Sequence, residues 1–283
     1  MPELFEQLAA PLQEPFMQRA LAGVALASLN CGVLGAYVVT RRMAFVSTAL
    51  THTILPGVVF AFLLGFSLYW GALGAALLTA LGVGVIAGGR ELREDTAVGV
   101  MFSLMFALGV WLMTASGNFR DFQGLLFGSA LGVTSRDLWM IGSASAVIFT
   151  LLTLFHRGLE LSSYDEEYAR QCGFAPAALR LLLLALVALG TVSCVQLVGA
   201  LLTTALLITP AAAAALLART LRGVMVLAAV FGVVSGVGGL LLSWYCAAWR
   251  VPSGAAVVFV CSTIFLVAFA WKRFALKSIF SPR

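Results

Sequence analysis

The sequence predicts an all-α polytopic membrane protein with about nine transmembrane helices. Of its 283 residues, 61% are hydrophobic and only 10% are charged, whereas a soluble domain carries about 25% charged residues. The apolar residues occur in long runs, and the charged residues lie between these runs. A membrane β-barrel would instead show short segments of alternating polarity. We therefore expect residues 1–283 to form a single transmembrane domain of helices.

The first half of the chain is expected to contain four spans separated by charged breaks. Arg41 and Arg42 end the first span, and the charged segment 88–95 follows the third. The N-terminal twenty residues carry three glutamates and no basic start, so they do not form a signal-peptide n-region; a surface helix and a solvated tail both remain open for them. The four spans are expected at about 20–39, 44–65, 70–87 and 96–114.

The second half is expected to contain five spans. The segment 124–132 is too short to cross a membrane and could form a surface or re-entrant helix. The uncharged run 181–217 is too long for one span and fits two spans joined by a tight turn. The positions at which the helix is expected to be irregular are Gln196, Gly199 and Pro210. The remaining three spans are expected at about 138–155, 224–247 and 255–271.

Nine spans place the two ends of the chain on opposite sides of the membrane, and the basic residues then decide the orientation. Positively charged residues are enriched in cytoplasmic loops. Under this scheme all but four of the 17 basic residues fall on one side, so the N-terminus is expected outside and the C-terminus in the cytoplasm. The four on the external side are Arg19, Arg120, Arg136 and Arg250.

The segment 41–57, RRMAFVSTALTHTILPG, is the most informative stretch, because it places one of only two histidines inside a span. Thr48, His52 and Pro56 are four residues apart and share one face of a helix. At about 1.5 Å per residue, His52 lies near mid-depth of a hydrocarbon core about 30 Å thick. Such a residue indicates a functional site, with a neutral histidine bonded to a neighbouring helix as the alternative.

The charged segment 159–180 predicts a compact element on the cytoplasmic face. Ser162 or Ser163 is expected to cap a short helix that has acidic residues in its first turn. Gly173 is expected to end this helix in a left-handed conformation, and Pro176 suits the start of the next one. The element could serve as a docking site or be an ordinary loop helix. The residues assigned to docking are Tyr164, Asp165, Glu167, Tyr168, Gly173 and Phe174.

Four stretches resemble the permease subunits of bacterial manganese, zinc and iron ABC transporters, the ABC-3 family. The segment 41–57 resembles the family's RRM…GDALSHAVLPG, and YDEEYARQCGF resembles its DPEYARALGL coupling helix. LVGALLTTALLITPAAAAALLA is similar to VVGVLLVVALLIIPAATARLLA, and PSGAAVVFV to the PSG-initiated last span. The motifs occur in the family's order and spacing, and the resemblance covers nearly the whole chain.

The resemblance implies the fold of the large type II ABC importers, in which two permease subunits surround one pathway. It implies a multi-pass protein of the bacterial inner membrane, embedded in lipids, that takes a divalent metal from a periplasmic or lipoprotein binding protein. A second permease, identical or related, and a cytoplasmic ATPase are the implied partners. The metal is the transported substrate rather than a permanently bound cofactor. Within this scheme His52 and Thr48 are the metal residues, and Pro56 and Gln196 belong to the path.

This sequence departs from the family at the metal residues. The family commonly has an aspartate at the position of Thr48 and a glycine at that of Ser47. A hydroxyl is a weaker ligand than a carboxylate for Mn²⁺ or Fe²⁺. Either the path binds metal weakly, or a related partner permease supplies the carboxylate.

Other functional classes find less support in the sequence. The chain lacks a GxxxxGK[ST] P-loop, so it is expected to be a permease and not the ATPase. No HExxH, GxSxG or paired aspartates lie in the spans, which argues against an intramembrane enzyme. The basic residues are scattered over short loops, which does not indicate nucleic-acid binding. The alternative function is an ABC permease for a metal chelate such as a siderophore.

Overall fold

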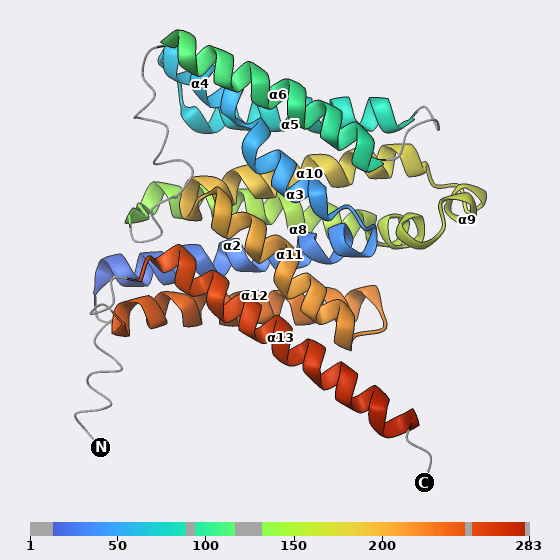
Figure 1. Ribbon diagram of the computed structural model, residues 1–283. Helices are drawn as coiled ribbons and strands as arrows, with labels where there is room; N and C mark the ends of the chain where they lie inside the picture. Colours follow the sequence, from blue (N-terminus) through green and yellow to red (C-terminus); the bar gives the residue numbers. More distant parts are fainter. Residues whose placement is uncertain (1–13, 89–93, 117–131, 247–250, 281–283) are drawn as a thin grey trace.

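The computed structural model describes residues 14–88, 94–116, 132–246 and 251–280, and this part of the chain folds as a layered bundle of helices (Figure 1). No strand occurs among these residues. The helices are α2 (Pro15–Thr40), α3 (Ala44–Thr53), α4 (Leu55–Leu64), α5 (Leu68–Gly88), α6 (Glu94–Ser116), α8 (Ser135–Tyr164), α9 (Glu166–Gln171), α10 (Pro176–Val198), α11 (Ala200–Leu217), α12 (Leu221–Tyr245) and α13 (Ser253–Phe280).

The predicted number of spans is confirmed. Within the described residues, 9 helical segments are long and apolar enough to cross a membrane, with α3 and α4 together forming one of them. The fifth expected span is longer than predicted, because α8 runs from Ser135 to Tyr164. It begins at a capping box in which the Thr134 hydroxyl and the Asp137 carboxylate each bond the other residue's backbone N–H. The expected segments 1–20 and 124–132 lie mostly outside the described residues. Residues 15–20 differ from the expectation, because they form the first turns of α2.

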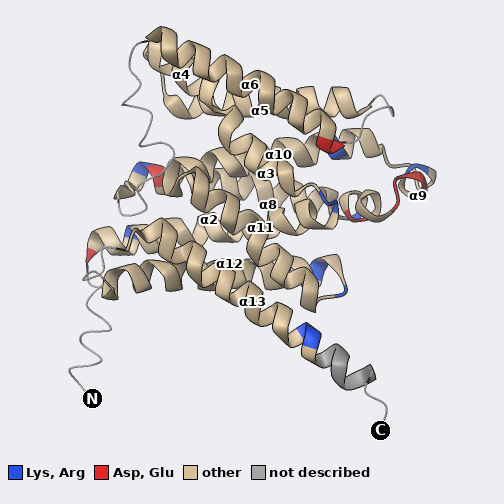
Figure 2. Cartoon of the chain, in the orientation of Figure 1, with Lys and Arg blue, Asp and Glu red and all other residues tan. Residues whose placement is uncertain are grey.

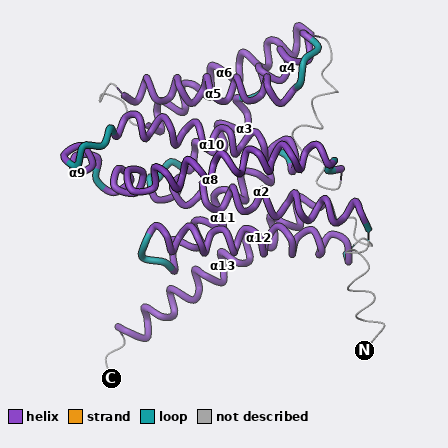
Figure 3. Tube along the Cα trace, turned by 180° about the vertical axis from the view of Figure 1, so that it is seen from behind, coloured by secondary structure: helices purple, strands orange, loops and turns teal. Residues whose placement is uncertain are grey.

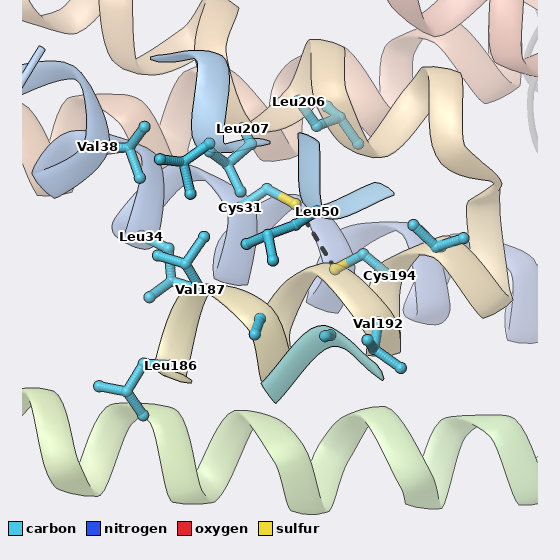
Figure 4. Packing of buried hydrophobic residues seen from close by; sticks show 14 of the residues in the cluster. Cys31, Leu34, Val38, Leu50, Leu186, Val187, Val192, Cys194, Leu206 and Leu207 are labelled. Carbon is cyan, nitrogen blue, oxygen red and sulfur yellow. Dashed lines mark hydrogen bonds between the residues drawn. The ribbon is translucent and has the colours of Figure 1, made fainter. Parts of the chain in front are cut away.

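Helix α2 lies at the centre of the bundle and packs against α8, α10, α11 and α12. Helices can approach this closely where their facing residues are small. A methyl group added at Gly32 would overlap the backbone of α12, and one at Gly35 would overlap that of α11. On another side of α2, the thiols of Cys31 and Cys194 meet at 3.6 Å and join α2 to α10 (Figure 4). Both cysteines are buried and unoxidised, as expected of small packing residues.

The tight turn predicted within 181–217 lies at Gly199. This single residue separates α10 from α11, and the chain reverses its direction there (Figure 1). Its φ of +85° lies in a region that residues with a Cβ rarely adopt. Pro210 lies inside α11 without ending it, and Gln196 lies in the last turn of α10. The two-span interpretation of this run is therefore confirmed.

The two ends of the bundle differ in charge. The described chain begins at one end and finishes at the other, as an odd number of spans requires (Figure 1). Most of the coloured charged residues lie at the end that holds α9 and the turn between α11 and α12 (Figure 2). The same end of the bundle is seen from behind in Figure 3. We refer to it as the α9 end, and the positive-inside rule predicts that it faces the cytoplasm.

We expect topology reporters to place the two ends on opposite sides of the membrane. A reporter fused after Arg283 should behave as cytoplasmic, because the chain leaves α13 at the α9 end. A reporter inserted at Asn118, between α6 and α8, should behave as external. Alkaline phosphatase and green fluorescent protein fusions measure the two locations, and an insertion after Asp165 serves as the cytoplasmic control. The nine-span topology is wrong if the first two reporters report the same side.

Candidate functional site

The second span is broken next to His52. Helix α3 ends at Thr53 and α4 begins at Leu55, with Ile54 between them. Pro56 explains the break, because it has no N–H to bond the carbonyl of His52 four residues earlier. That carbonyl accepts a hydrogen bond from the N–H of Ile54 instead. The predicted single helical face through Thr48, His52 and Pro56 is therefore interrupted, and Pro56 is buried in the first turn of α4.

Thr48 and His52 line a pocket of about 530 Å³ between α3, α11 and α13. The remaining wall comes mainly from α11, together with Val258 of α13. Thr204 and Thr209 are its other polar residues, and Thr204 also donates to the carbonyl of Ala200. Neither threonine is among the site residues predicted from the sequence. The feature of the sequence that could have identified them is the occurrence of hydroxyl side chains in an otherwise apolar run.

An aromatic pair covers the side of His52 that faces α6. The rings of Phe102 and Phe106 each lie 6.2 Å from the imidazole, centroid to centroid, in edge-to-face orientation. The two phenyl rings stack on each other at 5.6 Å. Among the described residues, no hydrogen bond reaches the ring nitrogens of His52. The aromatic pair fixes the ring by packing, so its nitrogens can still bind a ligand in the pocket.

The pocket offers few groups that could bind a metal ion. It offers one imidazole and several hydroxyls, and no group of three or more His, Cys, Asp or Glu side chains that could hold a metal occurs in the described chain. Hydroxyls are weak ligands for divalent transition metals. Gln196 does not join this pocket, because it lines a separate small one with Tyr69, Asp137 and Ser193. The structure therefore brings Thr48 and His52 together, but does not place Gln196 or Pro56 in the same wall.

The segment after α8 forms the compact element that the sequence predicted, with a different cap. Neither Ser162 nor Ser163 caps the short helix, because α8 continues through Tyr164. Asp165 is the N-cap of α9 and accepts a hydrogen bond from the N–H of Tyr168 at 3.0 Å. Gly173 adopts a φ of +84°, and Pro176 begins α10, both as predicted.

This element presents an aromatic and acidic surface to its surroundings. Tyr164 is 63% exposed, Tyr168 is 55% exposed and Phe174 is 38% exposed. Asp165 and Glu167 are exposed beside them. Exposed aromatic side chains of this kind are enriched in protein–protein interfaces. We call the six residues Tyr164, Asp165, Glu167, Tyr168, Gly173 and Phe174 the coupling patch.

Arg41 connects this element to the helix that carries His52. It lies between α2 and α3, and its guanidinium donates to the hydroxyls of Ser163 at 2.9 Å and Ser162 at 2.6 Å. Burial lowers the pKa of Arg41, while Glu94 and Glu166 oppose that shift; an arginine nevertheless stays charged at neutral pH. The start of α3 is thus tied to the end of α8 by two charge-assisted hydrogen bonds.

The comparisons with known proteins agree on one family. Residues 13–272 match the ABC 3 transport family. The manganese transport system membrane protein MntC of Halalkalibacterium halodurans is 38% identical over 94% of this chain and 89% of its own length. The manganese import system permease protein ScaB of Streptococcus gordonii is 32% identical over 90% of each chain. A probable iron transport system membrane protein of Haemophilus influenzae is 33% identical over 97% of this chain and 100% of its own.

Solved structures show the same architecture. PsaBC from Streptococcus pneumoniae, in complex with a Fab, superposes with a TM-score of 0.81 at 32% identity, over 94% of this chain and 95% of that chain. An inward-facing putative metal-chelate type ABC transporter gives a TM-score of 0.69 over 95% of this chain and 99% of its own. Its identity of 18% means that it supports the fold alone.

We expect Arg41→Gln to loosen the contact between the start of α3 and the end of α8. Hydrogen bonds to a charged group contribute about 1.5–3 kcal/mol each, and both would lose their charged donor. Hydrogen exchange, measured by mass spectrometry on peptides covering residues 159–171, should become faster. Arg42→Gln is the matched control, because Arg42 is exposed and adjacent. Equal exchange in the two variants would show that the Arg41 hydrogen bonds do not hold this element.

Proposed function

Because this chain belongs to the ABC 3 transport family, we propose that it is the permease subunit of an importer for divalent transition metal ions, with manganese as its principal substrate. Two relatives identical to it at 38% and 32% are named as manganese transport proteins, and a third is named for iron. Residues 13–272 of 283 lie within the family match. The observation that carries the proposal is the pocket around Thr48 and His52, the two residues that the resemblance implies as metal residues.

The location of this pocket supports a path shared between two permease subunits. It opens on the outer face of the single chain, between α3, α11 and α13, and not in the core around α2. A second permease subunit on this face would bring its own pocket opposite and enclose the metal. Two copies of this chain would contribute two imidazoles, whereas a related permease with aspartate at position 48 would add a carboxylate.

A weak site is compatible with transport. A path must release what it binds, so conduction favours sites that are neither too weak to attract the ion nor too strong to let it go. Thr48 in place of aspartate moves the site towards release. Metal would enter from an external binding protein at the end opposite α9.

The coupling patch is the proposed contact with a separate cytoplasmic ATPase. Its aromatic side chains are exposed at the α9 end, where no other described element covers them. The hydrogen bonds from Arg41 to Ser162 and Ser163 connect the end of α8, next to this patch, directly to the start of α3. Movement of the patch would thereby be transmitted to the helix that carries His52.

A metal chelate is the second candidate substrate, and the names of the relatives favour the free ion. Several relatives that share at least 30% identity with this chain are named for manganese or iron transport systems, and others of similar identity carry no substrate in their names. The metal-chelate type transporter shares the fold at only 18% identity. Chelate transport therefore has no support beyond the common architecture.

Docking is tested by changing the coupling patch. Gly173→Pro should uncouple the two proteins, because proline cannot adopt the φ of +84° found there. Tyr168→Ala removes an exposed ring without this backbone change. Both variants should insert into the membrane normally, and the co-purifying ATPase should fall several-fold. Trp139→Ala, which removes an 82% exposed ring from the start of α8, is the control. Unchanged association and uptake in both patch variants would remove this segment from the mechanism.

Transport through the pocket is tested at His52 and Thr48. His52→Ala should lower radiolabelled Mn²⁺ uptake into vesicles at least tenfold while leaving the protein folded and ATPase-bound, because the imidazole makes no hydrogen bond within the described chain. Thr48→Asp should tighten metal binding, since a carboxylate four residues before the histidine lies on the same helical face. Thr48→Val is its control, because it keeps the shape and adds no ligand. Wild-type uptake by His52→Ala would show that the histidine only packs.

A further inference from the structure

A second pocket lies away from the metal pocket, between α2, α8 and α12. It is a groove of about 520 Å³. Helices α8 and α12 lie behind α3, α11 and α13 in the view of Figure 1, so the two pockets open on different faces. The apolar part of the groove is lined by Val33, Phe149, Leu152, Met225, Val226 and Val230.

The groove ends at a polar cluster near the α9 end. Arg222 Nε donates to His156 Nε2 at 3.0 Å, and His156 Nδ1 is hydrogen-bonded to the Tyr37 hydroxyl at 2.8 Å. A carboxylate oxygen of Glu160 lies 3.5 Å from the same Nε2 atom. The terminal Nη groups of Arg222 have no hydrogen-bond partner among the described residues, and the side chain is exposed. They remain available to bind an anion at the mouth of the groove.

The electrostatics of this mouth favour an anion. Arg222 lies in the first turn of α12, where the helix dipole is positive and no acidic residue is present. Arg157 and Arg219, next to His156 and three residues before Arg222, are exposed at the same end. Glu160 is the acidic group of the cluster, and its contact is with His156. Within the described residues Arg222 forms no direct ion pair with a carboxylate, because Glu160 contacts His156 and not the guanidinium.

We propose that this groove binds an anionic phospholipid, with one acyl chain along α8 and α12 and the phosphate at Arg222. From Arg222 to Val230 the groove extends about 12 Å along α12. Val226 is 64% exposed and Val230 is 51% exposed, so the groove opens sideways towards the membrane. A soluble anion would not use the apolar wall, and an uncharged apolar ligand would not use Arg222. A phospholipid satisfies both, and basic pockets between helices at the cytoplasmic side are suited to such headgroups.

The headgroup is tested with the delipidated full-length protein in complex with its ATPase. Equal amounts of phosphatidylglycerol and phosphatidylcholine are added, and bound lipid is counted by native mass spectrometry. The wild type should retain phosphatidylglycerol preferentially. Arg222→Gln should weaken that binding about fivefold, the expected effect of one basic residue near a membrane surface. Arg222→Lys should preserve the preference, and Arg219→Gln, which removes an exposed arginine that does not line the groove, should weaken the binding less than Arg222→Gln does. Equal binding of both lipids by the wild type would overturn the proposal.

The proposal that an acyl chain occupies the groove is tested by narrowing the groove. Val226→Phe adds a ring at an exposed wall position and should displace phosphatidylglycerol even though Arg222 is intact. Val234→Phe is the matched control, since Val234 is 52% exposed on the same helix but lies outside the groove. Equal loss of bound phosphatidylglycerol in the two variants would show that the lipid binds nonspecifically around the protein and not in the groove. Loss of association between two copies of the chain in Val226→Phe would show that the groove is a protein interface instead.

Discussion

Every backbone N–H and C=O group inside a bilayer needs a partner within the protein, and the architecture of this chain follows from that constraint. Nine helical segments satisfy it across the described residues. Within the described residues the helix is interrupted inside the second span at Ile54, and the chain reverses between two spans at Gly199. Both residues are buried in protein, which is where irregular backbone can be accommodated without contact with lipid. Neighbouring helices therefore cover the irregular backbone at these two positions.

The break at Ile54 has a functional consequence, because it lies two residues after His52. Discontinuous helices near the middle of the membrane are common at transporter binding sites, where they free backbone groups and re-aim side chains. Here the break separates a buried Pro56 from a Thr48–His52 pair that faces an open pocket. Proline thus shapes the site without lining it. Phe102 and Phe106 contact the imidazole edge to face, and no hydrogen bond within the described chain occupies its nitrogens.

The α9 end combines three elements that the fold brings together from distant parts of the sequence. The coupling patch follows α8, Arg41 precedes α3, and the lipid groove ends at His156 and Arg222. Helix α8 is common to all three, since it holds His156, Ser162 and Ser163 and leads into α9. A rigid α8 would therefore connect events at the ATPase contact to the helix carrying His52 and to the surrounding lipid.

The sequence alone determined the class, the number of spans, the presence of a turn within 181–217 and the family, because long apolar runs and local motifs are properties of consecutive residues. Which of Gln196, Gly199 and Pro210 forms that turn was decided by the structure. The sequence also placed Thr48 and His52 on one face, which needs only the helical period. Tertiary structure decided the rest. The threonines of α11 meet His52, Gln196 lies in another pocket, and Arg41 reaches Ser162 and Ser163, only because helices far apart in sequence pack side by side. The cap at Asp165 also escaped prediction, since the polar serines before it are used to bind Arg41 and α8 continues past its apolar run.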